Sequence, residues 1–253
     1  MNLYNQRTSL QGIFLALLYF VLSVCGFVVN HAVPSSSPQV SFATIRPSTS
    51  TTFLSMATNN DVIPSRQFIF EGMEAFRQGD VVKSIEKFDA SVPPGTSAYL
   101  WQRGLSYYYN DEFEKGSKQF RDDVLRSPLD VEEIVWDIAC LLRMDSSKFP
   151  HPNQLSLPKG KKDRRPIMGT VYSLFRGEAS EEDLAKAGHS GGPGDEFYAL
   201  LYLGLFNEAM GETFKAENYM KSAVKTKYAQ VVGSKDYMVD VARVHCQLRH
   251  WTV

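Results

Sequence analysis

The chain has 253 residues, with 27 Lys and Arg against 28 Asp and Glu. Residues 61–253 contain all 28 acidic and 25 of the basic residues, so this part is slightly acidic and unsuited to general nucleic-acid binding, which requires a surplus of cations. The three cysteines are too few for a disulfide framework.

The first 30 residues are typical of a signal peptide or signal anchor. Residues 12–29 form an apolar run without charge, and Arg7 precedes it. Such a run acts as the apolar region of a cleaved signal or, if it is retained, as a membrane anchor.

Residues 31–60 are rich in Ser and Thr, and the first acidic residue of the chain is Asp61. This composition is typical of an organelle transit peptide. A signal followed by such a segment resembles the bipartite presequence of algae with complex plastids, with a join at Ser41–Phe42 and a second processing region at 51–57. The alternative is a disordered linker behind a retained membrane anchor.

Residues 61–253 are expected to form one all-α domain, because three segments repeat the same pattern of helix and turn: 68–88, 100–120 and 200–220. Each segment has a glycine in its first helix, a small residue in its second helix and a large apolar residue four positions later. These residues are Gly72, Ser84 and Phe88, then Gly104, Gly116 and Phe120, then Gly204, Ala216 and Met220. Two small residues let the helices cross closely, which offsets the cost of about 1 kcal/mol for a glycine within a helix. Pro128 ends the second unit.

The middle of the domain departs from the repeat. Residues 131–144 predict another first helix, with a capping box of Asp130 and Glu133 at its start. No partner helix follows directly, because the basic loop 150–166 contains four prolines. Helical patterns return at 167–176 and 180–187, and a last helix at 236–250 is expected to cover the exposed end of the stack.

This pattern is that of the tetratricopeptide repeat, whose hairpins stack into a right-handed superhelix, here of about ten helices. The order of elements over residues 64–247 resembles the NlpI family of bacterial lipoproteins. The resemblance implies a non-enzymatic adaptor that docks proteases and cell-wall hydrolases. Unlike those lipoproteins, the chain carries Cys25 within its apolar run rather than after it.

In this repeat type the first helices line the concave side, so one face of each is predicted to form a partner groove. The predicted groove residues are Ile69, Met73, Arg77, Trp101, Leu105, Tyr108, Tyr109, Tyr198 and Leu205, with Phe76 and Glu208 in the same register. The alternative is that many of them pack against adjacent helices.

The basic loop contains five cations and one acid within residues 158–166. The cations are Lys159, Lys161, Lys162, Arg164 and Arg165. The loop is either simply solvated or contacts an anionic membrane surface or an acidic partner.

No catalytic or metal-binding motif is present in the sequence, and no cofactor is expected. His245 and Cys246 are adjacent, but neighbouring helical residues point about 100° apart and do not face each other. Cys140 and Cys246 lie in apolar helical patterns and are predicted to be buried free thiols. The acidic pairs at 122–123 and 132–133 are expected on solvated helix faces or caps.

These observations together predict a non-enzymatic adaptor or assembly scaffold in a plastid, which binds protein segments in an aromatic groove. The alternative is a membrane-anchored adaptor of the secretory pathway that serves a protease or hydrolase, with residues 12–29 retained. An enzyme using His245 and Cys246 is a third reading.

Overall fold

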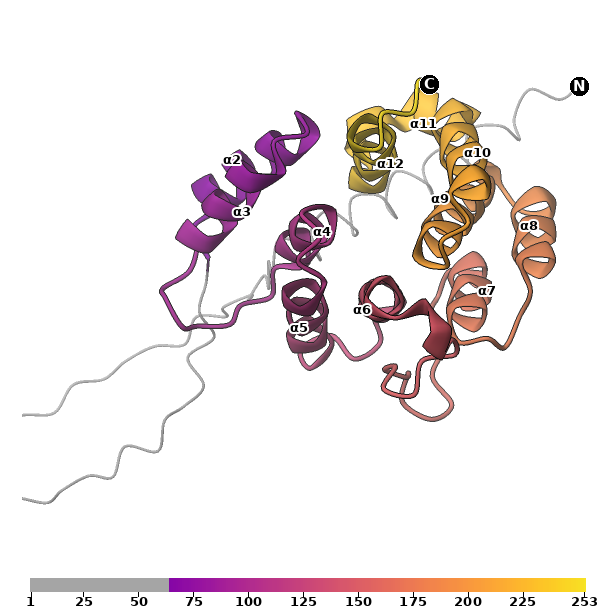
Figure 1. The fold of residues 1–253 in the computed structure, drawn as a ribbon, viewed down its shortest axis with the longest axis horizontal. Helices are drawn as coiled ribbons and strands as arrows, with labels where there is room; N and C mark the ends of the chain where they lie inside the picture. Colours follow the sequence, from indigo (N-terminus) through magenta and orange to yellow (C-terminus); the bar gives the residue numbers. More distant parts are fainter. Residues whose placement is uncertain (1–63) are drawn as a thin grey trace, which may run out of the picture. The chain divides into compact units, whose positions relative to one another are not determined.

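The computed structural model describes residues 64–253. The predicted signal segment 1–30 and transit-like segment 31–60 lie outside the described residues. Within them the chain forms eleven α-helices, two short 3-10 helices and no strand (Figure 1). The all-α prediction is therefore confirmed for this part of the chain.

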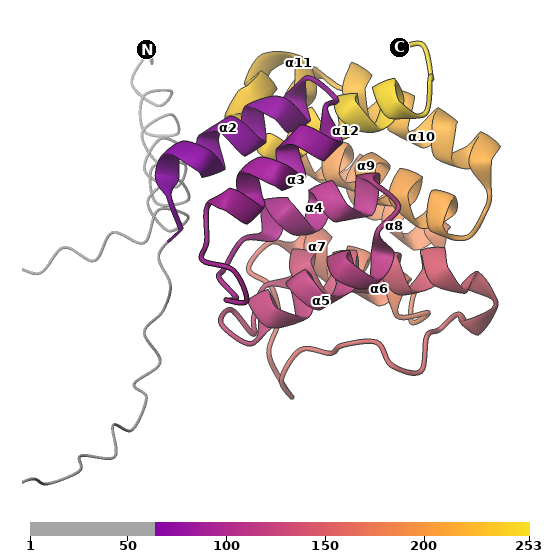
Figure 2. The same cartoon turned by 60° about the vertical axis from the view of Figure 1, so that its left-hand side comes forward.

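Helices that follow one another along the chain pack side by side, as α2 with α3, α4 with α5 and α9 with α10 (Figure 2). The α-helices are α2 (Arg66–Arg77), α3 (Val81–Ala90), α4 (Trp101–Tyr109), α5 (Phe113–Val124), α6 (Val131–Met144), α7 (Pro166–Phe175), α8 (Glu181–Ser190), α9 (Pro193–Ala209), α10 (Thr213–Lys225), α11 (Lys227–Val232) and α12 (Tyr237–Leu248). The 3-10 helices are η1 (Ser146–Lys148), after α6, and η2 (Gly233–Lys235), after α11.

The first two aligned segments form hairpins whose helices cross at a glycine. A Cβ atom added to Gly72 would lie 2.9 Å from the ring of Phe88, and one added to Gly104 would lie 2.7 Å from the ring of Phe120. The hydroxyl of Ser84 donates to the carbonyl of Gly72 over 2.8 Å. These contacts leave no room for a larger side chain on the first helix of either hairpin.

The third segment, the α9–α10 hairpin, crosses in the same way. A Cβ atom at Gly204 would lie 2.9 Å from the terminal methyl of Met220 and 3.4 Å from the carbonyl oxygen of Ala216. On α5, a Cβ atom at Gly116 would lie 3.4 Å from the carbonyl oxygen of Gly104. The repeated spacing in the sequence thus corresponds to equivalent crossings in three hairpins. Pro128 lies in the turn between α5 and α6.

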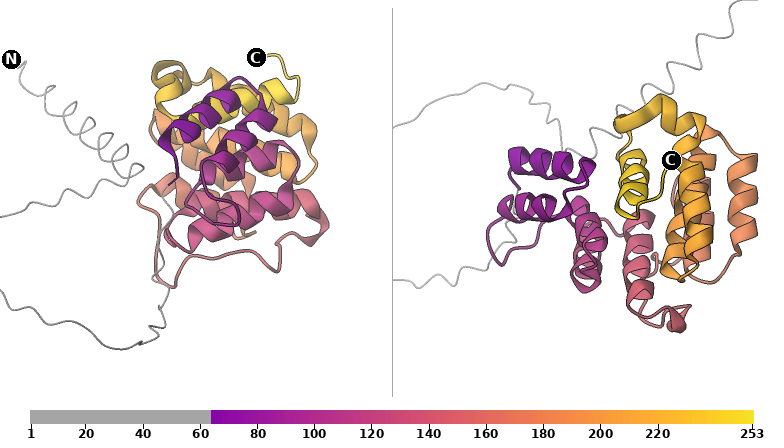
Figure 3. Two further views of the ribbon diagram at one scale, coloured as in Figure 1. Left: turned by 90° about the vertical axis from the view of Figure 1, so that its left-hand side faces the viewer. Right: turned by 45° about the horizontal axis from the view of Figure 1, so that its top comes forward.

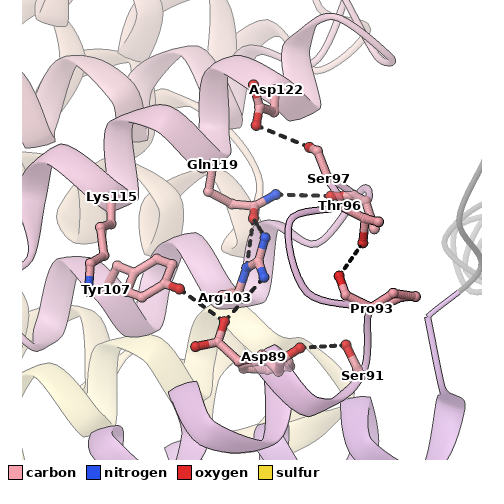
Figure 4. A network of polar contacts seen from close by, with 12 residues as sticks. Asp89, Ser91, Pro93, Thr96, Ser97, Arg103, Tyr107, Lys115, Gln119 and Asp122 are labelled. Carbon is pink, nitrogen blue, oxygen red and sulfur yellow. Dashed lines mark hydrogen bonds and ion pairs between the residues drawn. The ribbon is translucent and has the colours of Figure 1, made fainter.

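A polar network fixes the connection between the first two hairpins (Figure 4). Arg103 donates to Gln119 from α4 to α5 over 2.8 Å, and to Asp89 at the end of α3 over 3.2 Å. Tyr107 donates to the same Asp89 carboxylate over 3.0 Å, while Gln119 donates to the carbonyl of Ala98. The network joins α3, α4, α5 and the 91–100 connection, so it sets how one hairpin stacks on the next.

The start of α6 differs from the predicted capping box. Asp130 accepts a hydrogen bond from the backbone N–H of Glu132 over 3.1 Å, which caps the helix. Glu133 does not complete the box, because its side chain is turned inward and is only 3% exposed. The helix lies in the middle of the fold, where α5, α7 and α9 contact it.

The last helix, α12, lies on the inner side of the curve that runs from α2 to α10 (Figures 1 and 3). It contacts α10 and also α2, at the other end of the curve. The helix thus covers α10 of the last hairpin, as expected for the end of the stack, and in addition reaches across the inner side to α2. The short α11 and η2 reverse the chain direction, with Gly233 in the left-handed region at φ 54°, and so return α12 to the inner face.

Candidate functional site

The inner face of the helical curve is partly filled by α12. The ring of Tyr237 on α12 lies 5.7 Å from the ring of Phe76 and 5.4 Å from that of Trp101, between centroids. The Nε atom of Arg77 donates to Asp240 over 2.7 Å. These contacts hold α12 against α2 and α4 with aromatic packing and an ion pair.

Glu208, near the end of α9, is the centre of a buried charge cluster beside α12. It accepts a hydrogen bond from Tyr108 over 2.8 Å and lies 3.1 Å from the Nη1 atom of Arg143. Arg249 also donates to it. Burial by itself would raise the pKa of Glu208, but His245, Arg249 and Arg143 lower it to about 2. Glu208 is therefore an anion at any physiological pH.

His245 on α12 is fully buried next to this carboxylate. Its Nδ1 atom lies 3.0 Å from the hydroxyl of Tyr109, and its Nε2 atom lies 3.6 Å from Glu208. Burial lowers the pKa of His245 to about 4, so the ring is neutral at neutral pH. The ring of His245 contributes packing and one hydrogen bond, with Tyr109, between α12 and α4.

A cleft of about 680 Å³ opens above this cluster. Its lining combines apolar groups with both charges and is contributed by the ends of α6 and α9, η1, the start of α10 and the C-terminal residues. The lining residues are Leu142, Arg143, Met144, Asp145, Ser146, Ser147, Glu208, Ala209, Gly211, Thr213, Arg249 and Trp251. We call this the α6–α9 cleft.

The nine predicted groove residues fall into two groups. Ile69, Met73, Arg77, Trp101 and Tyr198 are half-buried. The hydroxyl of Tyr198 donates to Asp236, the residue that caps α12, over 3.0 Å. Arg77, Trp101 and Tyr198 contact α12 or its cap residue, so α12 covers part of their surface.

The other four residues, Leu105, Tyr108, Tyr109 and Leu205, are buried and offer no surface to a partner. Their placement in an open groove is therefore wrong, and the alternative interpretation of packing between helices applies. Tyr108 and Tyr109 still contribute to the site from below, since their hydroxyls bond to Glu208 and His245.

Sequence reasoning missed Arg143, Arg249 and Trp251. Arg143 lies near the end of the helix predicted at 131–144, for which the repeat pattern predicted no groove residue. Arg249 lies in the predicted last helix, 236–250, and Trp251 directly follows it, where no repeat guides an alignment. A spacing of four residues between His245 and Arg249 places both on one helix face and was the one available signal.

Two acidic residues that were expected on solvated faces are buried instead. Asp123 is 0% exposed and accepts hydrogen bonds from the N–H of Leu100 and from Gln119. Burial raises the pKa of Asp123 to about 7. Burial and the neighbouring carboxylates of Asp130 and Asp123 raise the pKa of Glu133 to about 9. Glu133 is thus a neutral carboxylic acid at neutral pH.

Cys140 and Cys246 are buried free thiols, as predicted. In the described residues, no three His, Cys, Asp or Glu side chains are grouped so that they could hold a metal ion. No helix between residues 64 and 253 combines the length and apolarity needed to cross a bilayer. The chain matches no protein-family model, and no curated protein is significantly similar to it.

Proposed function

We propose that the chain is a non-enzymatic adaptor of the tetratricopeptide-repeat type that binds a protein segment in the α6–α9 cleft. The three equivalent hairpin crossings at Gly72, Gly104 and Gly204 support the repeat architecture. Stacked hairpins of this kind create extended concave surfaces that bind peptides. The resemblance of the element order to NlpI-type adaptors is consistent with this reading.

One observation carries the choice of site. The inner face is filled by α12 at its α2 side, whereas the α6–α9 cleft remains open with about 680 Å³ of space. Its walls present the exposed Met144 and the half-buried Trp251 beside two arginines. An apolar or aromatic side chain would match Met144 and Trp251, since both arginines already pair with Glu208.

Photo-crosslinking tests the site directly. A crosslinking amino acid replaces Ser147, which is exposed and lines the cleft, and in a matched chain it replaces Lys186, which is exposed on α8. We expect defined protein adducts from position 147 that are absent at position 186 and are lost with Trp251→Ala. Equal adducts at both positions would contradict the proposed site.

For the location, we propose a plastid, with a membrane-anchored protein of the secretory pathway as the alternative. The support is the acid-free, hydroxyl-rich composition of residues 31–60 behind the apolar run 12–29. Sequencing the N-terminus of the mature protein distinguishes the two. A start near residues 42–58 supports the plastid, and an N-terminus that retains residues 12–29 supports the anchor.

A further inference from the structure

Four cations lie close together in the second half of the basic loop 150–166 and have no ion pair among the described residues. Lys159, Lys161, Lys162 and Arg164 are all exposed. Arg165, the fifth predicted cation, differs from them. It pairs with Glu132 over 2.7 Å and with Asp163 over 3.1 Å. The loop therefore carries four uncompensated charges, which we call the tip cations.

The base of the loop is held against the helices. The N–H of Leu157 donates to the hydroxyl of Tyr172 over 3.0 Å, and Arg176 donates to the carbonyl of Leu155 over 3.1 Å. On the other side, the two ion pairs of Arg165 fix the chain just before Pro166 begins α7. Both ends of the loop are thus anchored, so the tip cations are held together on one side of the domain.

A turn at the tip keeps the cations close in space. The N–H of Lys161 donates to the carbonyl of Pro158 over 3.0 Å. Gly160 takes a φ of 75°, a left-handed conformation that glycine adopts without strain. The tip presents its charges at a reversal of the chain instead of spreading them along an extended strand.

The tip cations contrast with the charge of the rest of the domain. Residues 64–253 contain 25 basic and 27 acidic residues. Five of those basic residues and one acid lie in 158–166, which leaves 20 basic against 26 acidic residues elsewhere. The basic segment 158–166 therefore contrasts with a remainder of the domain that is net negative. Near a flat anionic surface, such a distribution turns the basic tip toward the surface.

We propose that the tip cations dock the domain on an anionic lipid bilayer. Residues 158–166 contain no aromatic residue on which a base could stack, and their apolar residues are only the two prolines. They therefore provide neither a stacking platform for single-stranded nucleic acid nor the aromatic anchor of a protein interface. Attraction to anionic lipid headgroups needs only cations that are clustered on an exposed segment, and the tip cations meet this requirement.

Vesicle binding of the full chain tests this proposal. Vesicles of phosphatidylcholine alone are compared with vesicles of phosphatidylcholine and phosphatidylglycerol in a 3:1 ratio. Any contribution of the apolar run 12–29 is present with both compositions and cancels in the comparison. Each cation near an anionic surface contributes about fivefold in partition at low salt, so four contribute up to several hundredfold.

The test variant is K159Q/K161Q/K162Q/R164Q. The control is K83Q/K186Q/K225Q/K235Q, which removes the same charge from four exposed lysines on α3, α8, α10 and η2. None of the four has an ion pair within residues 64–253. We expect the test variant to lose at least tenfold in its preference for anionic vesicles, and the control to lose less than threefold. Higher salt should reduce the preference of the wild-type chain. Equal losses in the two variants would overturn the proposal.

Limited trypsin digestion gives a second, local measurement. The tip offers several cleavage sites after Lys and Arg. Anionic vesicles should protect the tip of the wild-type chain, whereas phosphatidylcholine vesicles should leave it cleavable. Protection by single-stranded RNA or by polyglutamate at the same salt concentration, without protection by anionic vesicles, would overturn the lipid assignment.

Discussion

The crossing of α4 and α5 is tight enough that one added methyl group should disturb it. In Gly104→Ala the new Cβ atom would lie 2.7 Å from two ring carbons of Phe120. The ring has little freedom to withdraw, because Phe120 is 1% exposed and stacks on Trp136 with 6.2 Å between centroids. Overpacking costs about 1–3 kcal/mol, and the rigid contact places this case near the upper value. Alanine regains about 1 kcal/mol of helix propensity. We expect a net loss of about 2 kcal/mol in the free energy of unfolding.

Urea unfolding followed by circular dichroism measures this loss. Gly169→Ala is the matched control, since Gly169 also lies within a helix, α7, but a Cβ atom there would meet nothing within 4 Å. We expect this variant to gain about 0.5–1 kcal/mol, because alanine favours the helix without a clash.

A double-mutant cycle separates the clash from a general effect of the substitution. When Phe120→Ala removes the ring, Gly104→Ala should become favourable by about 1 kcal/mol. The coupling between the two positions is then about 3 kcal/mol, which a cycle resolves easily. A Gly104→Ala protein as stable as the wild type, or a coupling below about 0.5 kcal/mol, would refute the argument that the glycine is required by close crossing.

Three further outcomes follow from buried groups. Because the folded-state pKa of Glu133, about 9, lies above its ordinary value of 4.5, its contribution to stability is fully present below pH 4.5 and is lost as the pH rises toward 9. The free energy of unfolding in urea should therefore fall between pH 6 and pH 9, by at most about 1.4 kcal/mol per pH unit. Glu133→Gln should flatten this dependence, and equal slopes in both proteins would contradict it. Tyr237→Leu removes two aromatic contacts of α12 and should lower the free energy of unfolding by about 1–3 kcal/mol. Amide exchange in α12 should then accelerate more than in α7. Uniform acceleration would contradict a local role of Tyr237. Arg77→Met leaves the Asp240 carboxylate, whose side chain is 6% exposed, without its closest cation. It should lower the free energy of unfolding by about 1–3 kcal/mol. The control Lys83→Met, on the exposed face of α3, should change the free energy of unfolding by less than about 0.5 kcal/mol.

The helix pairs could be predicted because their signal is local and repeated. A small residue, a second small residue twelve positions later and a large apolar residue after four more appear in three places. The close contacts at Gly72, Gly104 and Gly204 have a direct counterpart in that spacing. Such a pattern depends on two helices joined by a short turn, so it needs no knowledge of the rest of the chain.

Which residues of the inner face are buried could not be predicted in the same way. Tyr109 is covered by α12 through its contact with His245, and the position of α12 follows from the reversal through α11 and η2. That reversal has no counterpart in the repeats. The candidate cleft shares this difficulty, since Arg143, Glu208 and Arg249 come from three separate helices or their ends and meet only after the curve has closed.

The acidic pairs show a related limit. Helical spacing placed Asp123 and Glu133 on faces that are solvated in an isolated hairpin. In the structure, α6 is contacted by α5, α7 and α9, so little of its circumference faces solvent. A neutral carboxylic acid is tolerated there because burial itself suppresses ionisation.

The ion pair between Arg77 and Asp240 links positions that are 163 residues apart. During synthesis, the rings of Phe76 and Trp101 therefore stay uncovered until nearly the whole polypeptide has left the ribosome. A chain cut short before residue 236 would keep its hairpins but expose the aromatic surface that α12 normally covers. We expect such a product to aggregate more readily than the intact chain, because large exposed apolar patches promote association.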